Sequence, residues 1–294
     1  GIDKVFWGVT EFQHLVDIIN QPDNVESADG EQTLGQPMIR VSLAREWGTL
    51  TGFYLPYFRL RQFPDPITGR PTTGIKVRDE KAIFESDHER FNPDAALRYT
   101  HSLDVFDFGV SYFKGTARTP VLAFTAETYD GVSVVPRYDL ITQAGLDVQA
   151  TLGPWLLKFE GTRREQQNNW NTRATGGVEY TLYNFFDTGT DLGVVAEYMY
   201  DARGLASPQP LNDDFGLGLR WTANDTQSTA FLLGGIYDLE TDSTALSLEA
   251  ERRLGASFKA QLEVRIQETA GTGDTLANAL IDEDMVRFRI AYYF

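Results

Sequence analysis

The chain contains no cysteine among its 294 residues. This absence excludes disulfide-bonded scaffolds, zinc sites built from thiolates and any mechanism that uses a cysteine nucleophile. Long apolar runs are also missing, because no stretch reaches the roughly 18 to 20 residues that a membrane-spanning helix needs. The sequence is therefore neither a small disulfide-rich domain nor a helical membrane protein.

Basic residues are scarce. Lysine and arginine number 26 against 42 aspartates and glutamates, which gives a net charge of −16. Proteins that bind nucleic acid neutralise phosphates with basic patches, and none dominates this sequence. We expect no nucleic-acid partner. No signal peptide is recognisable at the N-terminus, which predicts a mature chain or a piece of one.

The last eleven residues, 284–294, alternate between apolar and polar side chains. Successive side chains of a strand point to opposite sides, so this segment predicts a strand with one apolar and one charged face. The apolar positions are Val286, Phe288, Ile290, Tyr292 and Phe294, and the positions between them include Arg287 and Arg289.

The same alternation recurs about every twenty residues and predicts thirteen strands. Segments of about ten residues that are apolar on one side and charged on the other are typical of transmembrane β-barrels. If the C-terminus lies in the periplasm, the predicted periplasmic turns are all short and the three longest connections are external, as in outer-membrane barrels. The predicted strands are 37–45, 49–62, 93–101, 104–114, 137–152, 154–164, 174–184, 191–202, 214–223, 228–239, 243–254, 257–267 and 284–294.

Bacterial single-chain barrels have an even number of strands, so we expect a fourteenth, and segment 2–9 is the candidate. The predicted fold is therefore all-β. It is a transmembrane antiparallel up-and-down barrel of about 14 strands, or 16 or more if residues are missing upstream. We expect 1–294 to form one domain.

Segment 10–20 breaks the strand pattern with apolar residues at helical spacing. Thr10 and Gln13 match a capping box, and Pro22 would end the helix. A helix this short needs a surface on which to dock its apolar stripe. We predict a short helix, followed by an acidic loop to residue 36, that either plugs the lumen or packs on the barrel rim. Its named residues are Phe12, His14, Leu15 and Asp17.

Charged side chains on one face of the predicted strands would line the pore. Basic and acidic positions nearly balance on this face, so the net negative charge lies mainly in loops and turns. The charges either set up a transverse field in a water-filled pore or pair across a narrow lumen, and an arginine ladder that binds anions is a third interpretation. The predicted lining residues are Arg59, Arg61, Arg98, Asp107, Lys158, Glu160, Glu197, Arg220, Glu249, Glu251, Arg265, Arg287 and Arg289.

Catalytic motifs are sparse. Asp87-His88 and Asp213-Asp214 faintly resemble the acid and histidine pairs of the outer-membrane omptin proteases, but that family spaces its catalytic pairs by one residue and these pairs are adjacent. The sequence has no glycine-rich phosphate loop, paired-histidine metal site or nucleophile elbow. We expect no enzymatic activity, no catalytic residues, no metal and no cofactor.

The chain resembles bacterial outer-membrane porin-like barrels over essentially its whole length. The resemblance rests on the C-terminal Arg289-Ile-Ala-Tyr-Tyr-Phe294, the repeated amphipathic strands and the loop asymmetry. Val5-Phe-Trp-Gly8, His14-Leu-Val-Asp-Ile-Ile-Asn20 and Gly153-Pro-Trp-Leu-Leu-Lys-Phe-Glu160 are similar to segments of an uncharacterised porin-like family of environmental Gram-negative bacteria. The resemblance implies an outer-membrane location with periplasmic termini. It also implies contact with lipid and lipopolysaccharide, and recognition of Phe294 by the barrel-insertion machinery.

These observations predict a porin-like channel for passive diffusion of small polar solutes. Two alternatives remain: a barrel scaffold that holds a partner protein or conduit, and an uptake barrel for hydrophobic compounds. The last would treat 1–36 as a hatch and leave an odd thirteen strands, and the inward charges oppose it. A homo-oligomer or an accessory protein is compatible with each.

Overall fold

The computed structural model describes residues 1–22, 33–63, 75–124, 132–207, 209, 211–268 and 284–294. This part of the chain is built almost entirely from β-strands. None of its helices is long and apolar enough to cross a membrane. The helical elements are four single 3-10 turns: η1 (Asp79–Lys81), η2 (Glu89–Phe91), η3 (Phe185–Asp187) and η4 (Gly204–Ala206).

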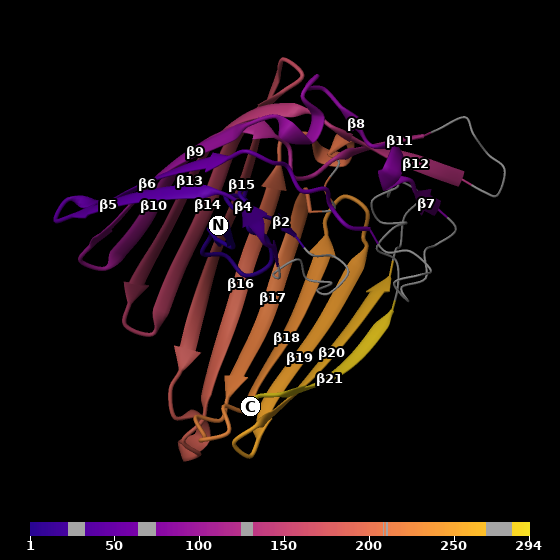
Figure 1. The fold of residues 1–294 in the computed structure, drawn as a ribbon. Coiled ribbons are helices and arrows are strands. Elements are labelled where there is room, and N and C mark those ends of the chain that lie inside the picture. The colour runs from indigo at the N-terminus through magenta and orange to yellow at the C-terminus, as the bar shows by residue number, and fades with distance from the viewer. Residues whose placement is uncertain (23–32, 64–74, 125–131, 208, 210, 269–283) are drawn as a thin grey trace. The chain divides into compact units, whose positions relative to one another are not determined.

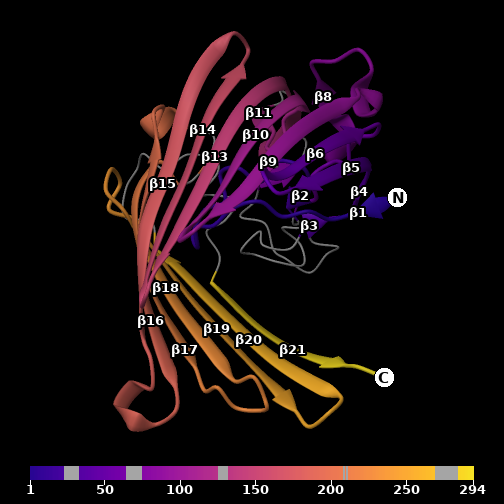
Figure 2. The ribbon, with the colours of Figure 1, turned by 90° about the vertical axis from the view of Figure 1, so that its left-hand side faces the viewer.

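Thirteen strands form one antiparallel sheet in which most neighbours follow each other along the chain (Figures 1 and 2). Its order is β5-β6-β9-β10-β13-β14-β15-β16-β17-β18-β19-β20-β21. The strands are β5 (Ile39–Arg45), β6 (Gly48–Leu55), β9 (Asp94–Leu103), β10 (Phe106–Thr116), β13 (Leu140–Leu152), β14 (Trp155–Gln166), β15 (Asn169–Leu182), β16 (Asp191–Asp201), β17 (Asp213–Thr222), β18 (Ala230–Asp238), β19 (Thr244–Leu254), β20 (Phe258–Glu268) and β21 (Met285–Tyr292).

All thirteen strands predicted from the alternation are therefore confirmed, but the fourteenth is wrong. Only Ile2–Asp3 of segment 2–9 is extended, as β1, and it pairs with β4 (Gln36–Pro37) instead of joining the large sheet. No closed barrel is present in the described residues, since β5 and β21 each pair on one side only. The strand predicted over 49–62 is also too long, because β6 ends at Leu55.

Two compact units divide the chain. The first comprises 1–9, 14–148 and 160–173, and the second comprises 10–13, 149–159 and 174–294. The second unit holds the meander from β16 to β21, whose neighbours pair residue by residue, for example Val194 with Leu219 and Leu217 with Gly235.

The first unit also contains short strands in regions predicted to be external loops. A four-stranded sheet pairs β12 with β11, β7 and β8, and β2 pairs with β3. The aromatic rings of Phe58, Phe84 and Tyr138 pack together beside this small sheet, with ring centroids 4.9 to 6.0 Å apart. The bounds are β7 (Ile75–Val77), β8 (Ile83–Phe84), β11 (Val121–Phe124), β12 (Val132–Tyr138), β2 (Gln21–Pro22) and β3 (Thr33–Leu34).

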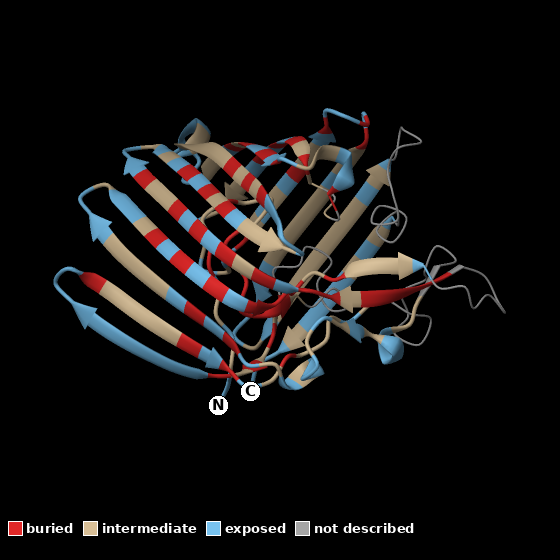
Figure 3. Ribbon diagram, turned by 90° about the horizontal axis from the view of Figure 1, so that it is seen from above, coloured by how far each residue is buried: buried red, intermediate tan, exposed pale blue. Residues whose placement is uncertain are grey.

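Burial along the strands is the reverse of that in a soluble sheet. On β16, Glu197 is 1% exposed and the neighbouring Tyr198 is 43% exposed. On β14, Glu160 is fully buried between exposed or half-buried neighbours that include Phe159. Figure 3 shows this alternation of buried and exposed residues along several strands. On these central strands one face is therefore polar and covered and the other is apolar and exposed, whereas β5 is exposed along its whole length.

Candidate functional site

Residues 5–20, here called the N-terminal segment, do not form the predicted helix. They are irregular, with bends but no helical turn. In a helix, backbone N–H groups are satisfied by carbonyls four residues earlier. Here the Val16 N–H bonds instead to the Glu160 carboxylate at 3.2 Å, and Thr10 donates its hydroxyl hydrogen to the Gln13 carbonyl at 2.5 Å. The segment contains no helical turn, so the helix prediction is wrong.

In the first unit, Glu160 on β14 holds two points of this segment. Its carboxylate accepts hydrogen bonds from the backbone N–H of Val9 at 2.7 Å and of Val16 at 3.2 Å. Gly8 precedes the first contact with φ of +130°, and a Cβ there would lie 2.7 Å from the Glu160 Oε1 atom. Only glycine fits this backbone conformation and this close approach.

In the second unit, Glu197 on β16 makes an equivalent contact. Its two carboxylate oxygens accept hydrogen bonds from the backbone N–H groups of Glu11 at 2.8 Å and Phe12 at 3.0 Å. Hydrogen bonds to an ionised acceptor are roughly twice as strong as neutral ones. A buried carboxylate also needs such partners, because burial of an unpaired charge is costly. Glu197 and the N-terminal segment therefore stabilise each other.

The ring of Phe12 occupies a notch lined by glycines of β17 and β18. A Cβ added at Gly216 would lie 2.6 Å from the Phe12 ring, and one at Gly234 would lie 3.2 Å from it. Gly218 contacts the same ring at 3.5 Å. These strand glycines leave space for an aromatic side chain that arrives from a distant part of the sequence.

Glu11 lies within a charged cluster in the second unit. Its carboxylate is 2.5 Å from the Arg220 guanidinium and 3.8 Å from the Lys158 ammonium, and Lys158 also pairs with Glu179 at 3.1 Å. Lys158 is itself buried, and these acidic partners offset the cost of removing its ammonium group from water.

In the first unit the segment is held by both packing and hydrogen bonds. Val16, Ile18 and Ile19 belong to the main hydrophobic cluster. The Arg118 guanidinium donates to the Ile19 carbonyl at 2.9 Å and forms a buried ion pair with Asp94 at 2.7 Å. The segment is thus part of the folded core of this unit.

Asp17 is a carboxyl group of the segment whose surroundings change its pKa. Burial raises its pKa to about 7, and the nearby Glu160 charge adds to this effect. A hydrogen bond from the Trp7 backbone N–H and the charges of Arg98 and Arg118 act in the opposite direction. Its Oδ1 atom is buried and has no hydrogen-bond partner in the described part of the chain. Asp17 is therefore held near the midpoint of its titration at neutral pH.

The other two named residues of the predicted plug also have defined contacts. Leu15 is buried, and its carbonyl accepts a 3.5 Å hydrogen bond from the Gln143 amide. The His14 ring packs edge-on against Phe6, with centroids 4.7 Å apart. Neither contact requires a helix. The acidic run from 23 to 32 lies outside the described residues.

Two predicted lining residues lie off the strands. Since β6 ends at Leu55, Arg59 and Arg61 belong to the connection that follows it. Arg59 donates to the Gly35 carbonyl at 3.0 Å, and the Arg61 backbone N–H donates to the Tyr138 hydroxyl at 3.2 Å. Arg59 and Arg61 therefore cannot contribute to an arginine ladder built from strand side chains.

The remaining predicted residues do lie on strands, mostly within ion pairs. The Arg98 guanidinium donates two hydrogen bonds to the Asp147 carboxylate, at 2.8 and 2.9 Å, so the charge of this predicted lining arginine is paired. On the last strands, Glu263 links Arg265 at 3.1 Å and Arg287 at 3.4 Å. Glu251 pairs with Lys259 at 2.7 Å, and the other positions on strands are Asp107 on β10, Glu249 on β19 and Arg289 on β21.

Sequence reasoning missed several residues that hold the segment. Arg118 and Gln143 both bond to it, yet neither stands out by sequence, because these contacts join positions 99 and 128 residues apart. Gly216 and Gly234 were visible as glycines within strands, a signal of close approach by another group. The partner of these glycines, Phe12, could not be read from that signal.

No family model, curated protein or solved structure matches this chain. In the described ranges, no group of three or more histidine, aspartate or glutamate side chains is arranged to hold a metal ion. The arrangement is that of a polar sheet face on which a chain segment is clamped.

Proposed function

We propose that the protein is a bacterial outer-membrane barrel and a channel for passive diffusion of small polar solutes, constricted by its own N-terminal segment. The reversed burial of the strands carries this proposal. Leu217, Leu246 and Ile266 are each at least 50% exposed, whereas Glu160 and Glu197 are buried. Apolar side chains that face out and charged side chains that face in are what a barrel in lipid requires.

A membrane location also requires that the sheet closes, because an open edge in hydrocarbon leaves backbone N–H and C=O groups without partners. The thirteen-strand sheet would close by direct pairing of its two edge strands or through one further strand. In either arrangement its polar face becomes the lumen.

The clamped segment accounts for the constriction. The Glu160 and Glu197 carboxylates accept hydrogen bonds from its backbone N–H groups, and the Phe12 ring occupies the notch lined by glycines. Solutes would pass beside the segment, or through space that it vacates.

Conductance in a planar bilayer tests this function. We expect small, ohmic steps from the wild-type protein and larger steps from the double variant Phe12→Ala/Glu197→Gln, in which the notch and one clamp are lost. Glu268→Gln, an exposed change at the end of β20, is the matched control and should conduct like the wild type. Silence from all three proteins, each folded by circular dichroism, would refute the channel and favour a scaffold for a partner.

A further inference from the structure

A pocket of about 570 Å³ lies in the first unit, between the start of the N-terminal segment and strands β6, β9, β10 and β13. Ligand pockets for small molecules fall in the range of roughly 300 to 1,000 Å³. Trp7, Gly8 and Val9 supply one wall, and the strands supply the other. All of its lining residues belong to a single unit, so its geometry stands on contacts within that unit.

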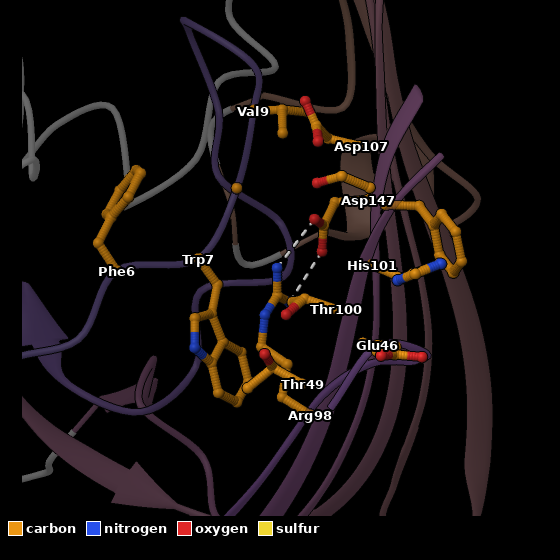
Figure 4. A pocket seen from close by; sticks show the side chains of 14 residues that line it. Phe6, Trp7, Val9, Glu46, Thr49, Arg98, Thr100, His101, Asp107 and Asp147 are labelled. Atoms are coloured by element: carbon orange, nitrogen blue, oxygen red, sulfur yellow. Dashed lines mark hydrogen bonds and ion pairs between the residues drawn. The ribbon is translucent and has the colours of Figure 1, made fainter. Parts of the chain in front are cut away.

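An ion pair and aromatic contacts hold the side chains at the centre of this pocket. Arg98 lies between Trp7 and Asp147, as Figure 4 shows: its guanidinium is 4.9 Å from the Trp7 ring centre and forms the two-point ion pair with Asp147. Trp7 is in turn fixed edge-on against Phe53, with centroids 5.5 Å apart. Gly109 leaves room for this pair, because a Cβ there would lie 2.5 Å from Arg98.

Arg98 is the only lysine or arginine among the described residues that line the pocket. Its charge is neutralised by the ion pair with Asp147, so it is not available to bind an anionic ligand. The other ionised lining groups are Glu46, in the β5–β6 turn, and Asp107, on β10. Both are exposed, and neither carboxylate makes a hydrogen bond or an ion pair with any residue that the structure describes. The pocket therefore presents two free negative charges and no free positive one.

Neutral groups complete the lining. Thr49 and Thr100 face each other across β6 and β9 and offer hydroxyl groups, and the half-exposed Phe6 offers an apolar surface. The His101 ring packs on the rings of Phe108 and Tyr99, with centroids 6.1 and 6.3 Å away.

We infer that this pocket binds a small organic cation, an ammonium group that carries a short polar or aliphatic chain. Either the Asp107 or the Glu46 carboxylate would pair with the charge, and the threonine hydroxyls and Phe6 would contact the rest. If the channel function proposed above holds, the pocket gives the channel a preference among polar solutes, since a solute that moves between the segment and the wall crosses it. Binding itself does not depend on conduction.

Isothermal titration of the full-length protein in detergent micelles tests this inference with choline as the cationic probe and propionate as the anionic one. We expect choline to bind and propionate not to bind. Glu46→Gln/Asp107→Asn should weaken choline binding at least tenfold, and raised salt should weaken wild-type binding because exposed charges are screened. Asp104→Asn is the matched control: it removes an exposed charge from the adjacent β9–β10 turn, outside the pocket, and should bind as the wild type does.

The inference is overturned if choline fails to bind, if propionate binds as well, or if the double variant keeps the wild-type affinity. Circular dichroism and tryptophan emission of each variant establish that it is folded. If the protein binds choline but does not conduct, the pocket inference stands and the proposed channel function fails. If it conducts but does not bind choline, the channel function stands and the pocket inference fails.

Discussion

At the scale of single residues, the contact of Phe12 with Gly216 shows how closely the N-terminal segment fits the sheet. Gly216→Ala puts a methyl group where the Phe12 ring now lies, because the added Cβ falls 2.6 Å from it. Overpacking of this kind costs about 1 to 3 kcal/mol. We expect the amide hydrogens of Glu11 and Phe12 to exchange about tenfold faster or more, measured by hydrogen–deuterium exchange with mass spectrometry.

The control for this change is Gly176→Ala on β15, where an added Cβ meets only Phe159 at 3.9 Å. Its exchange at Glu11 and Phe12 should match the wild type. Equal exchange in both variants would mean that Phe12 does not depend on the notch.

Asp17 makes the stability of the folded N-terminal segment depend on pH. Its pKa is raised by burial from 3.8 to about 7, so the folded protein keeps the proton that the unfolded chain has already released. The contribution of this proton to the free energy of unfolding is fully present below about pH 4. It decreases as pH rises from there to about 7 and is constant above that. Stability therefore decreases with rising pH across this window.

We accordingly expect proteolysis within the N-terminal segment to accelerate between pH 4 and 7 in the wild type, after correction for the activity of the protease. Asp17→Asn keeps the shape and cannot ionise, so the Asp17 contribution to this dependence should vanish. Glu160, Arg98 and Arg118 face the same site and stay unchanged in the variant. A pH profile identical to the wild type would show that Asp17 does not titrate here.

At the residue scale, the strand pattern predicts the face of a strand on which a side chain lies. The pattern placed Lys158, Glu160 and Glu197 on the polar face, and all three are buried there. It could not reveal that Glu160 and Glu197 bind backbone N–H groups of residues 9–16, because such contacts join positions about 150 to 190 residues apart. Alternation determines the face of a side chain but not its partner.

At the scale of elements, the strands are predictable and the irregular segment is not. Period-two alternation is clear in central strands such as β14 and β16, because one face meets a different environment from the other. Residues 12–19 have helical spacing, yet Glu160 takes the Val16 backbone N–H that a helix would use. Tertiary hydrogen bonds therefore override a short helical pattern whose isolated stability is marginal.

The last strand provides a direct test of the apolar face, and the absence of cysteine makes single labels unique. Phe288 on β21 is 65% exposed, and Arg289 is its neighbour on the opposite face. In lipid vesicles we expect a fluorophore at Phe288→Cys to be quenched by nitroxide-labelled lipid. A fluorophore at Arg289→Cys should respond to a water-soluble quencher instead. Equal quenching by lipid at both positions would contradict the proposed orientation of the strand.

At the scale of the whole molecule, most of the net negative charge of the proposed channel lies away from its pore. The net charge of −16 would favour cations strongly if it lined the pore. Most strand charges on the polar face are instead paired, as in Lys158 with Glu179 and Arg98 with Asp147. We therefore expect a reversal potential close to zero in a potassium chloride gradient.

Removal of two basic residues from the polar face should move that potential toward cation selectivity. Lys158→Gln/Arg220→Gln takes both cations from the Glu11 cluster and leaves its carboxylates in place. Arg45→Gln/Arg252→Gln removes the same charge from exposed positions and should leave the potential near its wild-type value. If the wild type is already strongly cation-selective, or if both double variants shift alike, the acidic loops rather than the polar face of the sheet control permeation.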